Sequence, residues 1–169
     1  FLKASSDTSA GTYAVEVTTV GERATASAGT DQTGNLAADE ILTINDVSIS
    51  LNAGMSQTQV VNRINEFSSQ TGVTAEVDGT TTRLYTEAFG SGAEISVISN
   101  IAGAATSSGF GTSEITDSGV DIIGTIDGNS YTGVGNVLTA NSGSAKGLSV
   151  QLAVDSTDAT LTVTGAQGN

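Results

Sequence analysis

The chain of 169 residues has a formal net charge of −13, from 18 acidic and 5 basic residues, and it contains neither cysteine nor histidine. This composition excludes disulfides, thiolate and imidazole catalysis, and the usual zinc and iron sites. The basic residues are too few and too dispersed to bind a nucleic acid or an anionic membrane, and no apolar run reaches the ~20 residues of a membrane-spanning helix. The composition indicates an acidic, well-solvated module.

The first predicted element is a strand over Tyr13–Val17, in which apolar and polar residues alternate. Residues 21–38 show no period and few large apolar groups, so we expect a loop and a domain boundary there. Two alternating runs then flank Asn45 and Asp46, which tolerate the left-handed conformations of a tight turn. The pattern predicts a β-hairpin over Ile41–Leu51.

One amphipathic helix is predicted between Ser56 and Gly72. Ser56 and Gln59 have the spacing of a capping box at its start, and Gly72 can adopt the left-handed conformation that ends a last turn. Such a helix needs one face docked on a sheet, because its apolar residues form a single stripe. The stripe consists of Val60, Val61, Ile64 and Phe67.

The period changes from 3.6 to 2 directly after this helix, which predicts a strand over Val73–Val77 and a turn at Asp78 and Gly79. A further strand is predicted over Glu94–Ser99. Residues 101–119 are small and polar, so we expect a second domain boundary there.

The rest of the chain is predicted to be β, with a hairpin at Asp127 and Gly128. Thr43–Ile49 and Thr125–Tyr131 share the same spacing around their turns. This similarity is explained either by an internal duplication or by shared turn chemistry.

The sequence indicates no catalytic, cofactor-binding or metal-binding residue, and we expect no enzyme. Ser142 and Ser144 precede Lys146 without the S-x-x-K spacing, and Gly90–Ile95 begins like a dinucleotide loop but lacks its third glycine. No EF-hand pattern occurs, and no aromatic platform for a sugar accompanies the acidic residues.

The stretch Leu42–Val97 closely resembles the flagellin-type IN motif, in which a hairpin and a helix ending in Ile-Asn precede Gly-Val-Thr-Ala and a glycine turn. Within the motif, Ser56 and Gln59 supply the start of the helix. The other matching residues are Ile64, Asn65, Gly72, Val73, Thr74, Ala75, Asp78 and Gly79.

The flanking sequences resemble the head region of the flagellar hook-associated protein 2 family of filament-capping proteins. Residues 9–24 are similar to its opening strand, although Val20 and Gly21 stand where the family usually has Leu-Ala, and residues 118–152 are similar to its closing segment. The resemblance implies a mainly β fold with one helix (α+β), made of two small β-rich domains. We expect an all-β host domain, residues 1–34 and 117–169, and an inserted IN-motif α+β domain, residues 35–116.

The resemblance implies a structural role in the plate of an oligomeric cap, outside the cell at the distal end of the bacterial flagellum. Its partners would be flagellin subunits and further copies of itself. Two alternatives are a flagellin hypervariable surface domain and an adhesin-like module that binds host glycan or mucin. The helical legs of the family are absent, so we expect a fragment of a longer protein. Its acidic surface favours a monomer or weak association in isolation.

Overall fold

A computed structural model describes residues 2–152 and 158–163 of the chain. The chain divides into two compact units. Unit 1 comprises Phe1–Glu22, Phe89–Gly92 and Gly119–Asn169, and unit 2 comprises Arg23–Ala88 and Ala93–Ser118. Along the chain, unit 2 lies between Glu22 and Gly119 and is interrupted by Phe89–Gly92. The domain bounds expected from the sequence, after residues 34 and 116, stay a prediction.

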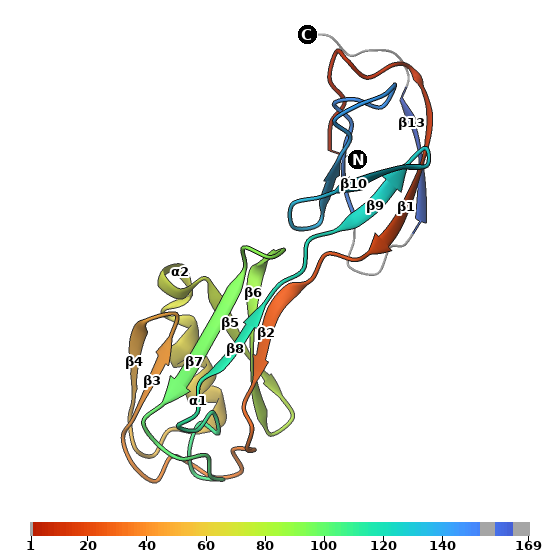
Figure 1. The fold of residues 1–169 in the computed structure, drawn as a ribbon. Coiled ribbons are helices and arrows are strands. Elements are labelled where there is room, and N and C mark those ends of the chain that lie inside the picture. Colours follow the sequence, from red (N-terminus) through yellow and green to blue (C-terminus); the bar gives the residue numbers. More distant parts are fainter. Residues whose placement is uncertain (1, 153–157, 164–169) are drawn as a thin grey trace. The chain divides into compact units, whose positions relative to one another are not determined.

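Unit 1 is built on an antiparallel sheet with the strand order β10-β9-β1-β13 (Figure 1). A second ladder joins β11 to β12. Its strands are β1 (Gly11–Thr19), β9 (Ile123–Ile126), β10 (Asn129–Thr132), β11 (Val137–Thr139), β12 (Ser149–Gln151) and β13 (Asp158–Val163). The alternation in β1 buries Tyr13, Val15 and Val17, as the sequence predicts. These side chains pack with Ile126 and Leu138 in one apolar core.

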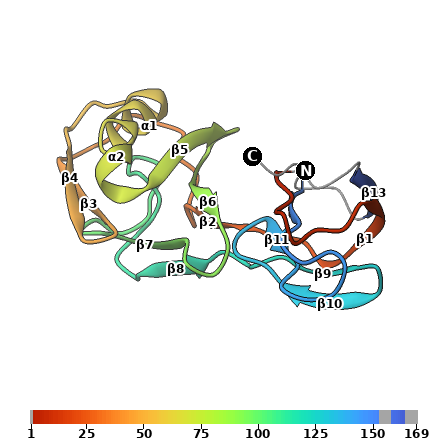
Figure 2. The same ribbon diagram turned by 90° about the horizontal axis from the view of Figure 1, so that it is seen from above.

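Unit 2 contains two sheets, with the strand orders β4-β3-β7-β8 and β2-β6-β5. Its strands are β2 (Arg23–Ser27), β3 (Glu40–Ile44), β4 (Val47–Leu51), β5 (Val73–Asp78), β6 (Thr81–Phe89), β7 (Glu94–Ser99) and β8 (Ile115–Ser118), and its helices are α1 (Gln57–Asn65) and α2 (Ser68–Thr71). Both helices lie beside β5 (Figure 2), and α1 also contacts β4. One core lies between the helix and the inward faces of both sheets.

The turns at Asn45-Asp46 and Asp127-Gly128 have the same geometry, because φ is positive at both central residues of each: 47° and 66° in the first, 50° and 78° in the second. Each turn joins two antiparallel neighbours, β3 with β4 and β9 with β10. This geometry is the type I′ turn that suits the twist of a two-residue hairpin. The two segments therefore share a turn type as well as a spacing, which is expected both from an internal duplication and from shared turn chemistry.

The sequence predicts a loop within residues 21–38 and a domain boundary within residues 101–119, but each stretch contains a strand. Arg23–Ser27 forms β2 within the first, and Ile115–Ser118 forms β8 within the second. The alternation in β2 depends on Ala24 and Ala26, which are buried but are too small to stand out as an apolar pattern. The loop prediction was wrong there, because in a core of small side chains an alanine can serve as the buried residue of a strand.

The single predicted helix is interrupted. α1 ends at Asn65, and Phe67 departs from helical geometry with φ −102° and ψ 6° before α2 begins. At the break, the N–H of Phe67 donates to the carbonyl of Ile64, which is the tighter three-residue spacing. Phe67 packs against the core at this point, and the Arg63 guanidinium lies 4.9 Å from the centre of its ring.

The described part of the chain has the mainly β, α+β fold that the sequence predicts. Within that part, neither helix has the length and apolar character needed to span a membrane.

Candidate functional site

The residues weighed for nucleophilic catalysis make contacts with other parts of unit 1. Lys146 Nζ lies 3.3 Å from the Asp7 carboxylate. The backbone carbonyls of the two serines that precede Lys146 accept hydrogen bonds from tyrosine hydroxyls. The Ser144 carbonyl accepts a hydrogen bond from Tyr13, and the Ser142 carbonyl accepts one from Tyr131. Among the residues that the structure describes, no three acidic side chains are grouped so that they could hold a metal. The residues of interest are therefore those of the motif in unit 2.

The start of α1 has the predicted capping box. The Ser56 hydroxyl accepts a hydrogen bond from the Gln59 N–H, and the Gln59 side chain accepts one from the Ser56 N–H at 2.9 Å. Two of the N–H groups that a helix start leaves unpaired are thus satisfied. Gly72 has φ 72° and closes α2, with its N–H donating to the Ser68 carbonyl. The two predicted caps belong to consecutive helical segments instead of one helix.

Ile64 and Asn65, the last two residues of α1, have separate structural roles. The Ile64 side chain is fully buried in the core of unit 2. The Asn65 carboxamide lies against Ala75 of β5, where its Oδ1 accepts the Ala75 N–H at 2.7 Å and its Nδ2 donates to the Ala75 carbonyl at 3.0 Å. Because β5 is an edge strand, the amide takes the place of a neighbouring strand at this residue. Ile64 therefore anchors the helix in the core, and Asn65 fastens it to the sheet.

The Gly-Val-Thr-Ala segment turns the chain from α2 into β5. The Val73 side chain is fully buried and its N–H donates to the Thr71 hydroxyl, while Thr74 faces outward, 3.3 Å from a Glu87 oxygen. Asp78 ends the strand and pairs with Thr81. Gly79, with φ 63°, occupies the turn between them.

Asn45 connects the β3–β4 turn to two other elements. Its Nδ2 donates to the carbonyls of Thr71 and Glu94 at 2.9 and 3.0 Å, and its Oδ1 accepts the Ser96 N–H at 2.8 Å. The side chain thus ties the hairpin to the end of α2 and to β7. The sequence predicts Asn45 as a turn residue, but it does not show these long-range bonds.

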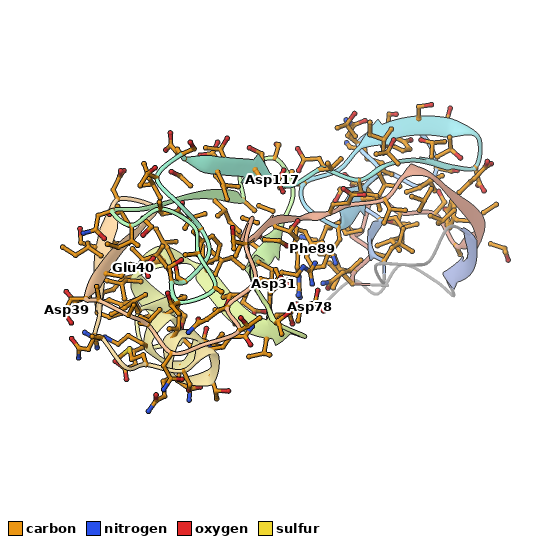
Figure 3. All side chains as sticks on the ribbon, turned by 90° about the horizontal axis from the view of Figure 1, so that it is seen from below. Asp31, Asp39, Glu40, Asp78, Phe89 and Asp117 are labelled. Atoms are coloured by element: carbon orange, nitrogen blue, oxygen red, sulfur yellow. The ribbon has the colours of Figure 1, made fainter. Side chains whose placement is uncertain are left out.

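Glu40 is a buried acid that the sequence analysis missed, and it lies inside unit 2 (Figure 3). Its carboxylate accepts hydrogen bonds from the Ser99 hydroxyl at 2.6 Å, the Ser108 N–H at 2.9 Å and the Ser108 hydroxyl. These donors replace the hydrogen bonds to water that the buried side chain loses. A signal was present, because Glu40 has the same parity as Leu42 and Ile44 in β3 and so shares their buried face.

The loop before β3 is fixed to the β5–β6 turn by Asp31. The Thr81 hydroxyl donates to its carboxylate at 2.6 Å, and the Gln32 N–H donates to the Thr80 carbonyl. The hydroxyls of Thr81 and Thr80 favour the ionised carboxylate and therefore lower the pKa of Asp31 below its usual value. Polar contacts of Asp31, Glu40, Asn45 and Asn65 therefore hold the loops, helices and strands of unit 2 in one arrangement.

Comparison with known protein families gives a match within unit 2. Residues 28–86 match the family model of the flagellin hook IN motif. This range runs from the loop before β3 to near the end of β6, so it contains all the motif residues predicted from the sequence. A comparison with curated protein sequences finds no match.

Comparison with solved structures finds a similar fold over both units. The D2-D3 domains of the flagellar cap protein FliD from Escherichia coli are 17% identical, with a TM-score of 0.59 and coverage of 96% of this chain and 93% of that one. The D1-D2-D3 domains from the same species are 21% identical, with a TM-score of 0.56 and coverage of 94% and 50%. FliD (HAP2) from Pseudomonas aeruginosa PAO1 is 17% identical, with a TM-score of 0.52 and coverage of 92% and 80%.

The chain therefore has the fold of the D2-D3 domains of flagellar cap proteins, with a flagellin hook IN motif in its inserted unit. The resemblance to the head region of hook-associated protein 2 is confirmed at the level of the fold.

Proposed function

We propose that this chain is the head region of a filament cap, a structural protein that stands outside the cell at the distal end of the bacterial flagellum. The agreement of fold with cap-protein domains over 96% of the chain is the main support. It covers residues of both units, and so it depends on more than the IN motif alone.

In this role the chain works by shape, without chemistry of its own. Its partners are flagellin subunits, whose assembly the cap assists, and further copies of the cap protein. The Asn45, Asn65 and Glu40 contacts hold the inserted unit in one arrangement, which suits a plate that must keep its form while subunits are added. The net charge of −13 opposes association of acidic plates in isolation, so oligomerisation depends on other parts of the intact protein.

A flagellin hypervariable domain is the alternative that the motif alone would allow. It is less well supported, because the structural matches that extend over unit 1 are to flagellar cap proteins. For an adhesin-like domain that binds glycan or mucin, no feature of the described residues provides support.

Immunogold electron microscopy on the organism that encodes the chain tests the proposal. An antibody raised against residues 1–169 should label only the distal tip of each filament. A strain without the gene controls for specificity. Label along the whole filament would favour the flagellin alternative, and label on the cell body without the flagellum would contradict both flagellar roles.

A further inference from the structure

The connection between β6 and β7 joins the two sheets of unit 2, yet the last residue of β6, Phe89, and the residues that follow it to Gly92 belong to unit 1. The Gly90 N–H donates to the Glu22 carbonyl at 2.9 Å. The same carbonyl accepts the Val120 N–H, so three separate segments of the chain meet there. We call this meeting point the junction, and it consists of Glu22, Phe89–Gly92, Gly119–Asp121 and Gly135.

Asp121 is the polar centre of the junction. One carboxylate oxygen accepts the N–H groups of Ser91 at 3.1 Å and Gly135 at 2.9 Å, and the other accepts the Ser91 hydroxyl at 2.6 Å. The Ser91 hydroxyl, followed by the two N–H groups, stabilises the ionised form and lowers the pKa of Asp121. One side chain therefore binds the connection on one side and the turn before β11 on the other.

The junction is packed backbone against backbone. A Cβ at Gly90, where φ is 98°, would lie 2.4 Å from the Asp121 carboxylate and 2.7 Å from the Gly135 backbone. A Cβ at Gly119 would lie 2.3 Å from the Gly90 carbonyl and 2.5 Å from that of Glu22. No side chain fits at either glycine without moving the main chain, so the connection has little freedom to shift while the Asp121 bonds are in place.

We propose that Asp121 is a positioning residue that couples the folding of the two units. It holds the link between the sheets of unit 2 within the backbone of unit 1, so the units unfold as one cooperative system. Two independent domains would instead be expected if unit 2 were a detachable insertion.

Hydrogen exchange of the complete chain in increasing urea tests the coupling. In the unsubstituted protein, amides of β6 in unit 2 and of β1 in unit 1 should lose protection in the same step. In Asp121→Ala the Ser91 and Gly135 amides should exchange about tenfold faster or more, and the two strands should open in separate steps. Asp31→Ala is the matched control, because it removes a carboxylate that also accepts a hydroxyl bond but lies in unit 2. It should leave both junction amides and the single step unchanged.

Ser91→Ala is the milder variant that decides the question if Asp121→Ala does not fold. It removes the hydroxyl bond and leaves both N–H bonds, so the junction amides should exchange severalfold faster in a folded protein. The proposal is overturned if the unsubstituted units already open in separate steps. It is also overturned if the substitutions leave the single step and the exchange of the junction amides unchanged.

Discussion

Units 1 and 2 both use side chains to bond backbone groups outside the strand ladders, but the kinds of side chain differ. In unit 2, the carboxamides of Asn45 and Asn65 and the carboxylate of Glu40 bond to backbone groups that no strand partner reaches. In unit 1, backbones meet directly at glycines, and the Tyr13 hydroxyl lies 2.6 Å from the Ser9 carbonyl and 2.9 Å from that of Ser144. The inserted unit therefore uses two carboxamides and one buried carboxylate for these bonds, whereas the host unit uses the Tyr13 hydroxyl and the Asp121 carboxylate.

The largest effect should come from the core of the motif. Ile64→Ala removes a fully buried side chain between the helix and both sheets, and it should lower the free energy of unfolding by roughly 2–5 kcal/mol. Ile41→Ala makes the same deletion on the outer face of β3, where 46% of the side chain is exposed. Urea denaturation should show a much smaller loss for this control. Equal losses would mean that the helix is not anchored through Ile64.

The contact between α1 and β5 should contribute less to the free energy of unfolding than the buried core does. Asn65→Ala leaves the N–H and carbonyl of Ala75 without the bonds that the amide supplies, so we expect a loss of about 1–3 kcal/mol. Asn62→Ala, on the exposed side of the same helix, should change stability by no more than about 0.5 kcal/mol. If thermal or urea unfolding does not distinguish these variants, the Asn65 carboxamide does not stabilise the contact between α1 and β5.

A smaller loss is expected from the corresponding contact in unit 1. Tyr13→Phe keeps the buried ring and removes the hydroxyl that lies against two carbonyls, which should cost about 1 kcal/mol. Tyr85→Phe, on the outer face of β6, serves as the control and should have almost no effect on the urea midpoint. A loss for Tyr13→Phe as large as that for Asn65→Ala would remove the contrast between the units.

The smallest effect should appear on changing pH. The chain has no histidine, so no side chain with an ordinary pKa titrates between pH 5 and 8, and stability should be nearly constant there. Asp31 in unit 2 and Asp121 in unit 1 both have lowered pKa values, so each stabilises the fold above its unfolded pKa. That contribution is lost as the pH falls below about 4 and through the folded pKa. Thermal melts should show this acid limb in the unsubstituted protein and a weaker one in Asp31→Asn. A clear change in melting temperature between pH 5 and 8 would contradict the account.

The structure of unit 2 could be predicted from the sequence better than the junction, because the residues that form the junction lie far apart along the chain. The caps of the helical segments, the hairpin at Asn45 and the change of period after Gly72 are local patterns. The bonds of Asp121 to Ser91 and Gly135 bring together positions that no local period links. The strand β2 was not predicted for a different reason: its buried residues are alanines, and their burial depends on the surrounding layers.

Removal of the gene region that encodes residues 1–169, followed by electron microscopy of the flagella, tests the proposed role most directly. We expect cells with absent or much shortened filaments and little swimming. The intact gene should restore growth, and residues 1–169 supplied alone should not, because this chain is proposed to be only the head region of the cap. Filaments of normal length and normal swimming in the deletion strain would contradict a function in the cap.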